Sequence, residues 1–169
     1  MDKIIIIPQQ DEHIPGQAAA LTSVAREGKY LSTNTGFSEE SARMFTQDCH
    51  KQGFPQFVAV DTDKNIVVGW CDIVARPEHP RGVGFLGVGL LPDYRGRGIG
   101  TRLMLETIRA AEKSGFSTIC LECRASNKNA IKVYKKMGFR TCFYNPFGLM
   151  LEGAVIPIIG MKAKISRIL

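Results

Sequence analysis

The sequence predicts one mixed α/β domain over residues 1–169, with a single β-sheet and helices on both of its faces. The chain has 169 residues, and 44% of them are apolar, which is enough for one sizeable core. Its segments change repeatedly between short apolar runs, typical of strands, and the helical spacing of apolar residues. The resulting order is strand, two helices, three strands, helix, strand, helix and two strands. A hairpin-rich first half followed by a βαβα centre favours a mixed sheet.

The first third of the chain is expected to form one strand and two helices, over residues 3–8, 14–26 and 38–52. Pro15 lies in the first turn of the first helix, where its missing N–H costs little, and Gly28 follows the helix end. Ser38 is a good N-cap for the second helix, and Glu39 and Glu40 suit the positive end of its dipole. The polar loop between the two helices could border a substrate cleft.

The rest of the chain is expected to form six strands and two helices. The strands are expected at residues 56–60, 66–74, 83–91, 118–124, 139–144 and 154–162, and the helices at 99–114 and 127–137. Gly138 should end the last helix as a left-handed cap. A loop that holds Asn145, Pro146 and Gly148 is expected to separate the last two strands.

Charge is divided unevenly along the chain. Residues 1–70 hold six Lys and Arg against nine Asp and Glu, a net charge of −3, whereas residues 71–169 hold 16 against seven, a net charge of +9. The basic part therefore favours an anionic ligand. The longest aliphatic run, Ile4 to Ile7, is far too short for a membrane span, and five scattered cysteines favour a reducing cytoplasm over a disulfide framework. We expect a cytoplasmic protein without a membrane partner and without a metal site.

The most informative stretch runs from Leu90 to Thr101, where a predicted strand passes through a glycine-rich turn into an amphipathic helix. The start of a helix offers unpaired N–H groups and the positive end of the dipole to an anion. The glycines remove side chains that would keep a phosphate away from the backbone. Arg95 and Arg97 add positive charge. These features predict a phosphate-binding turn.

The spacing of this turn excludes two common nucleotide motifs. No Lys follows Gly100 as a P-loop requires, and the glycines run G-x-G-x-G instead of the dinucleotide pattern G-x-G-x-x-G. Arg95, Gly98 and Gly100 instead match the pattern [Q/R]-x-x-G-x-[G/A]. Here the sequence resembles the GNAT superfamily of acetyl-CoA-dependent N-acetyltransferases.

A second stretch strengthens the resemblance. Residues 121–139 read L-E-C-R-A-S-N-x-x-A-I-x-x-Y-x-x-x-G-F, similar to the strand, loop and helix that hold pantetheine in this superfamily. Within the superfamily this stretch is most similar to ribosomal-protein-alanine acetyltransferases. The resemblance covers residues 57–139 well and the ends by element order only. It implies a mostly antiparallel sheet of about seven strands, splayed at its centre.

The resemblance implies that acetyl-CoA is a co-substrate, held between the strands at 83–91 and 118–124. Backbone N–H groups around Val88 to Leu90 would hold and polarise the acetyl carbonyl. Gly87 and Gly89 suit a bulged strand there, or plain packing. The residues expected to bind the cofactor are Val88, Leu90, Arg95, Gly96, Arg97, Gly98, Ile99, Gly100, Thr101, Asn127 and Tyr134.

Two of the expected site residues carry chemistry. Tyr134 is the candidate general acid, because a phenol beside the pantetheine can protonate the departing sulfur. Glu122 is the candidate base: it lies in an apolar strand, where loss of water would raise its pKa. A purely structural role for Glu122 stays open, and Asp72, Glu78 and His79 are competitors for the base.

The function expected from these features is direct acetyl transfer from acetyl-CoA to a primary amine, either a protein N-terminus or a small cationic molecule. The alternative is a non-catalytic module that binds CoA or another phosphorylated ligand. A basic nucleic-acid binder is a third reading, but we expect no nucleic-acid partner, because the arginines gather at the glycine turn. A homodimer is left open.

Overall fold

The computed structural model describes residues 3–169 and contains one seven-stranded sheet with the strand order β1-β2-β3-β4-β5-β7-β6. Every neighbouring pair is antiparallel except β4 and β5, which are parallel. The mixed, mostly antiparallel sheet predicted from the sequence is therefore confirmed. The strands are β1 (Ile4–Pro8), β2 (Gln56–Asp61), β3 (Ile66–Val74), β4 (Val83–Leu90), β5 (Thr118–Arg124), β6 (Arg140–Leu151) and β7 (Ala154–Lys164).

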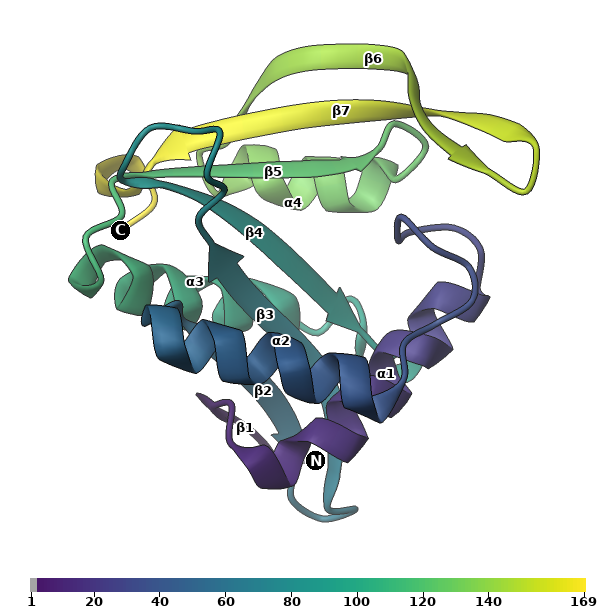
Figure 1. Cartoon of the computed structure of the whole chain (residues 1–169), viewed down its shortest axis with the longest axis vertical. Coiled ribbons are helices and arrows are strands. Elements are labelled where there is room, and N and C mark those ends of the chain that lie inside the picture. Colours follow the sequence, from purple (N-terminus) through teal and green to yellow (C-terminus); the bar gives the residue numbers. More distant parts are fainter. Residues whose placement is uncertain (1–2) are drawn as a thin grey trace.

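Four α-helices cover the sheet, two on each face (Figure 1). On one face lie α1 (Ile14–Arg26) and α2 (Glu39–Gln52), and on the other lie α3 (Ile99–Lys113) and α4 (Lys128–Lys136). The predicted N-cap is present: the side chain of Ser38 accepts a hydrogen bond from the Ser41 N–H. At the other end of α2, Gly53 forms a left-handed C-cap with a φ of +71°, which was not predicted from the sequence. Local capping chemistry thus sets the bounds of α2.

The larger core lies between the sheet and α3. Leu103 and Ile108 of α3 are fully buried, and they pack with Ile73 of β3 and Ile119 of β5. A second core lies under α1, where Ala20 and Val24 pack around Trp70 of β3. The two cores fix the central strands from both sides.

The sheet is splayed between its two parallel strands. Val83, Gly84 and Phe85 of β4 pair with Thr118, Ile119 and Cys120 of β5, and no further pair joins these strands. Beyond Phe85 the strands diverge, which Figure 1 shows as a V that opens toward the N-terminal end of α3. Backbone groups of both strands inside the V are therefore not used by the sheet.

One predicted loop is wrong. β6 was expected to end at residue 144, before a loop with Asn145, Pro146 and Gly148, but it continues to Leu151. Its pairing with β7 shifts register between Asn145 and Leu149. Such a bulge takes Pro146, which lacks an N–H, into an edge strand without breaking the strand. The turn chemistry read from the sequence therefore belongs to a bulge inside a long hairpin.

Candidate active site

The glycine turn between β4 and α3 has the backbone geometry that an anion site needs. Gly96 and Gly98 adopt left-handed φ values of +72° and +75°, and Gly98 is the N-cap of α3. A Cβ at either position would meet nothing within 4 Å, so this side of the turn is open. The first-turn N–H groups of Ile99, Gly100 and Thr101 have no acceptor within the helix. Together with the helix dipole they can bind a phosphate.

The side chain of Arg95 ties this turn to α1 instead of pointing freely at a ligand. Its Nη1 donates a 2.9 Å hydrogen bond to Oε2 of Glu27, and its Nε donates to the Leu90 carbonyl at 3.0 Å. Its guanidinium also lies 4.7 Å from the centre of the Tyr30 ring. Arg95 is thus neutralised by Glu27, and the charge expected from it at the turn is already paired.

A second contact holds the turn from the other side. The Tyr94 hydroxyl donates a 2.7 Å hydrogen bond to Asp61, whose side chain is fully buried at the end of β2. This hydrogen bond lowers the pKa of Asp61. Lys64 in turn donates to the Tyr94 hydroxyl at 3.0 Å. Arg97 is exposed and lies 5.5 Å from the Tyr94 ring. Two ion-pair and hydrogen-bond clusters therefore position the phosphate turn.

The β4 segment beside the V is a regular strand. Its pairing with β3 runs without a register shift from Phe85 to Leu90, so no bulge lies between these two strands. Gly89 is a packing glycine, because a Cβ there would lie 2.2 Å from the Trp70 ring. Val88 and Leu90 are half-buried against the larger core.

Tyr134 lies on α4, and Asn127 is the N-cap of that helix, which lies behind β5 in Figure 1. The Tyr134 side chain is buried, meets Phe139 edge to face at 6.0 Å, and has its pKa raised by that burial. It therefore keeps its proton at neutral pH and is available as a donor. The Asn127 side chain caps α4 by accepting a hydrogen bond from the Ala130 N–H at 3.3 Å.

The environment expected for Glu122 is wrong. Its side chain is 44% exposed and lies 3.7 Å from Arg76, so it is solvated and ion-paired. The alternation of β5 turns this position away from the core residues Leu121 and Cys123, toward the face that carries α1 and α2. The splayed sheet leaves this face uncovered at β5, which the strand pattern alone could not reveal.

The competitors for the base differ sharply in burial. Glu78 and His79 are exposed in the loop after β3, and the His79 ring stacks at 4.6 Å from that of Phe85. Asp72 is half-buried on β3 opposite Gly87, and burial raises the pKa of its carboxyl to about 7. Among these three, only Asp72 is partly buried.

Sequence reasoning missed Arg124, at the end of β5. Its buried guanidinium donates to the carbonyls of Gly28 and Leu31 and to Oδ1 of Asn34, at 2.6–3.1 Å. Arg124 thereby anchors the loop between α1 and α2 across the end of β5. The signal in the sequence was a single arginine that ends an otherwise apolar strand.

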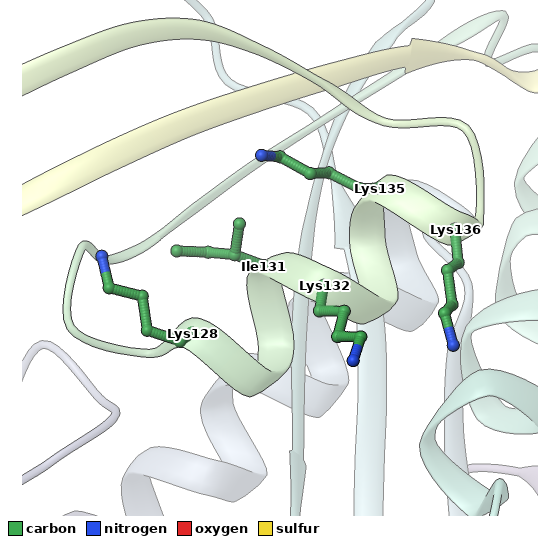
Figure 2. A pocket seen from close by; sticks show the side chains of 5 residues that line it. All are labelled: Lys128, Ile131, Lys132, Lys135 and Lys136. Carbon is green, nitrogen blue, oxygen red and sulfur yellow. The ribbon is translucent and has the colours of Figure 1, made fainter.

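A basic hollow lies on α4, around the apolar side chain of Ile131. It has a volume of about 490 Å³ and is open to solvent. Figure 2 shows four lysines around it, with Lys132 and Lys136 directed to the side opposite Lys135. The lining residues are Lys128, Ile131, Lys132, Lys135 and Lys136. The hollow adds positive charge to the helix that carries Tyr134.

The sequence as a whole defines an acetyltransferase of the GNAT class. The sequence profile described as "Acetyltransferase (GNAT) family" matches residues 22–139. The chain therefore belongs to the GNAT acetyltransferase family.

Curated relatives are similar over parts of the chain. The mycothiol acetyltransferase of Renibacterium salmoninarum is 31% identical over 137 residues, which are 79% of this chain and 38% of the relative. The [ribosomal protein bS18]-alanine N-acetyltransferase of Escherichia coli is 46% identical over 48 residues, 28% of this chain and 32% of the relative. This chain spans less than half the length of either relative.

Solved structures match the fold over nearly the whole chain. The ribosomal-protein-alanine N-acetyltransferase from Brucella melitensis has a TM-score of 0.88 at 22% identity, covering 95% of this chain and 99% of that chain. The yncA protein of Salmonella typhimurium, a putative acetyltransferase solved with its cofactor acetyl-CoA, also has a TM-score of 0.88, at 14% identity. The match covers 96% of this chain and 94% of that chain.

Within residues 3–169, no helix is long and apolar enough to cross a membrane.

Proposed function

We propose that this protein transfers the acetyl group of acetyl-CoA directly to a primary amine within a ternary complex. The observation that carries the proposal is the V between β4 and β5, with the open αL turn of Gly96 and Gly98 at one end and the buried Tyr134 on its far wall. This arrangement gives a thioester a place between an amide-lined strand and a proton donor. Membership of the GNAT family supports the same reaction.

Acetyl-CoA would use three parts of the site. The N–H groups at the start of α3 bind the pyrophosphate, and the lysines of α4 add charge that favours the cofactor's phosphates. The pantetheine lies along the V, where Asn127 offers its amide. The unpaired backbone N–H groups of β4 around Val88 to Leu90 polarise the acetyl carbonyl.

Tyr134 serves as the general acid. After the amine attacks the thioester carbon, the C–S bond breaks and the CoA thiolate takes the phenol proton. Burial favours the neutral phenol, so Tyr134 enters each turnover protonated. No cysteine acts as a nucleophile, because direct transfer needs none.

The acceptor is a primary amine, in a protein N-terminus or a small cationic molecule. The face that carries α1 and α2 presents Asp72 and Glu122 beside the V, and two carboxyl groups favour a cation. Arg124 holds the loop of residues 28–34 at the edge of this face, so the loop lines the approach of the acceptor. The E. coli relative carries a protein alanine in its name, which supports the first of the two acceptor classes.

The test is a panel of primary amines, namely peptides with free N-termini, lysine peptides, polyamines and aminoglycosides, mixed with protein and acetyl-CoA while free thiol is measured. We expect thiol release that depends on both the amine and the protein. If acetyl-CoA binds but no amine raises thiol release, the protein is the non-catalytic CoA-binding module instead.

A further inference from the structure

Three strands bring a row of residues together where the sheet splays. Asp72 of β3 is paired with Gly87 of β4. Phe85 of β4 pairs with Cys120 of β5, and the two strands are parallel. Two residues farther along each strand, Gly87 and Glu122 therefore lie opposite each other across the opening V. Side chains two residues apart share a face. The row Asp72, Gly87 and Glu122 therefore crosses the sheet on one face, at the point where the cofactor site begins.

Glycine in the middle of this row lets the Asp72 carboxylate lie close against the β4 backbone. A Cβ on Gly87 would lie 3.3 Å from Oδ1 of Asp72, so the carboxylate lies directly over the glycine backbone. The next residue, Val88, offers one of the amides proposed to hold the acetyl carbonyl. An amine nitrogen that contacts the Asp72 carboxylate from the V would thus lie next to the acetyl carbon.

The Asp72 carboxylate is unpaired in the part of the chain that the structure describes. No hydrogen bond or ion pair to it is formed by any residue from 3 to 169. The titratable groups that face or adjoin it are neutral thiols, Cys49 from α2 and Cys71 beside it on β3. Gln56 is its neighbour on β2. Glu122 of β5 and Arg76, in the loop after β3, pair with each other. Burial among these groups raises the pKa of Asp72 to about 7.

We infer that Asp72 is a catalytic residue that takes the proton from the acceptor ammonium, and that Glu122 attracts the cation without acting as the base. This inference rests on the proposed acetyl transfer and assigns its proton acceptor. Gly87, which has no side chain, lets the Asp72 carboxylate reach the β4 backbone beside the proposed position of the acetyl group.

The proton balance is complete with the groups named. The acceptor R-NH3+ gives one proton to Asp72, and the resulting R-NH2 forms a bond to the acetyl carbon. When the C–S bond breaks, the thiolate takes the proton of Tyr134. The second proton lost by the nitrogen, as it becomes an amide, restores Tyr134 through solvent. Asp72 releases its proton to solvent, so each turnover yields the acetamide, CoA thiol and one proton.

The test compares two kinds of acceptor on parent, Asp72→Asn and Glu122→Gln proteins. One acceptor is the best alkylamine of the panel, which is charged at neutral pH, and the other is an alkoxyamine, which is already neutral. For the alkylamine, we expect parent kcat/KM to rise with pH through an ionisation near pH 7 and Asp72→Asn to lose that limb, with a rate about 10² to 10⁴-fold lower. For the alkoxyamine, we expect Asp72→Asn to lose less than about tenfold. Glu122→Gln should keep the ionising limb and raise KM for the cation.

Several results would overturn the inference. The inference fails if kcat/KM of Asp72→Asn still rises with pH through the ionisation near pH 7, or if this variant loses the same factor in kcat/KM with both acceptors. It also fails if Glu122→Gln loses the ionisation. If Asp72→Asn does not bind acetyl-CoA as the parent does, the same measurements are made on Asp72→Ser, which also lacks the carboxylate. Absence of amine-dependent thiol release in the parent would refute the proposed function itself, which is a different outcome from an unchanged pH profile.

Discussion

At the scale of single residues, burial distinguishes ionisable side chains that the sequence alone could not tell apart. Tyr134 and Glu122 both come from a motif of GNAT type, yet the structure buries the phenol and leaves the carboxylate 44% exposed beside Arg76. Asp72, which carries no motif, is the carboxyl group whose pKa burial raises to about 7. The proposed proton donor and proton acceptor are thus distinguished by surroundings that depend on long-range packing.

Removing the Tyr134 hydroxyl should slow chemistry without weakening the cofactor complex. Tyr134→Phe keeps the ring against Phe139 and deletes only the proton donor. We expect kcat to fall by about 10² to 10⁴-fold, while the acetyl-CoA Kd stays within a few fold. Tyr144→Phe is the matched control, because Tyr144 is exposed on β6. An unchanged kcat in Tyr134→Phe would reduce Tyr134 to a core aromatic.

The raised pKa of Asp72 also predicts a pH effect on stability. Between the ordinary carboxyl pKa near 4 and its folded value of about 7, the unfolded chain has lost this proton and the folded protein has not. This group therefore destabilises the fold progressively as pH rises through that window. We expect the Tm of Asp72→Asn, relative to the parent, to be higher at pH 8 than at pH 5. Parallel pH curves of parent and Asp72→Asn would contradict this.

At the scale of elements, the turn before α3 combines backbone conformation with anchoring from outside. Its two αL glycines open the N–H groups of the helix start, and the Arg95–Glu27 and Tyr94–Asp61 contacts hold the turn to α1 and β2. The glycine spacing is visible in the sequence. The two contacts join residues 68 and 33 positions apart, so no local pattern could predict them.

An alanine at Gly98 should disturb this turn specifically. The left-handed φ of +75° costs an L-residue about 1–2 kcal/mol, so the turn is expected to relax away from its anion-binding geometry. We expect the acetyl-CoA Kd to rise about tenfold, the equivalent of about 1.4 kcal/mol. Gly115→Ala introduces comparable strain at φ +90° at the far end of α3, and titration calorimetry should find its Kd unchanged. If both variants bind acetyl-CoA with the same Kd, the turn at Gly98 does not take part in cofactor binding.

The loop between α1 and α2 should depend on Arg124. Arg124→Gln removes donors to the carbonyls of Gly28 and Leu31, which frees the loop. We expect KM for the amine to rise more than tenfold while the Kd for acetyl-CoA changes little, as measured by steady-state kinetics and calorimetry. Arg109→Gln, on an exposed i,i+3 pair of α3, is the control. A matching loss of both affinities would show that Arg124 supports the whole site.

The sequence predicted helices and strands well where periodicity and caps agree, as in α2 and α3. It failed at β6, where Asn145, Pro146 and Gly148 are typical of a loop but form a bulge that pairing with β7 extends to Leu151. The glycine turn and Tyr134 could be proposed as site residues from the sequence because both belong to local motifs. Asp72 and Arg124 gain their roles from neighbouring strands and a distant loop, which no window along the chain contains.

At the scale of the molecule, the two charge regions of the chain meet at the V. The basic second part supplies α3 and α4, and the acidic first part supplies α1, α2 and their loop. Figure 1 shows these pairs of helices on opposite faces of the sheet. An anionic cofactor and a cationic acceptor can therefore approach from opposite faces and react between the diverging strands.

Acetyl-CoA should stabilise the whole fold, because it binds groups from β4, α3 and α4 that only the folded chain brings together. At a hundredfold excess over Kd, linkage gives about 2.7 kcal/mol, a rise in Tm of about 5–10 °C for a chain of this size. The rise should shrink in high salt, which screens phosphate contacts. Differential scanning fluorimetry with acetyl-CoA measures both effects, and an unmoved Tm at saturation would contradict binding at this site.

The central claim is that the acetyl group moves from sulfur to an amine nitrogen at the V. The most direct measurement is mass spectrometry of the products formed from isotope-labelled acetyl-CoA and the best amine of the panel. We predict that the label is recovered as an N-acetylated amine in equal amount to the CoA thiol, and that Tyr134→Phe reduces both together. Recovery of the label as free acetate, or thiol release that does not depend on the amine, would contradict the claim.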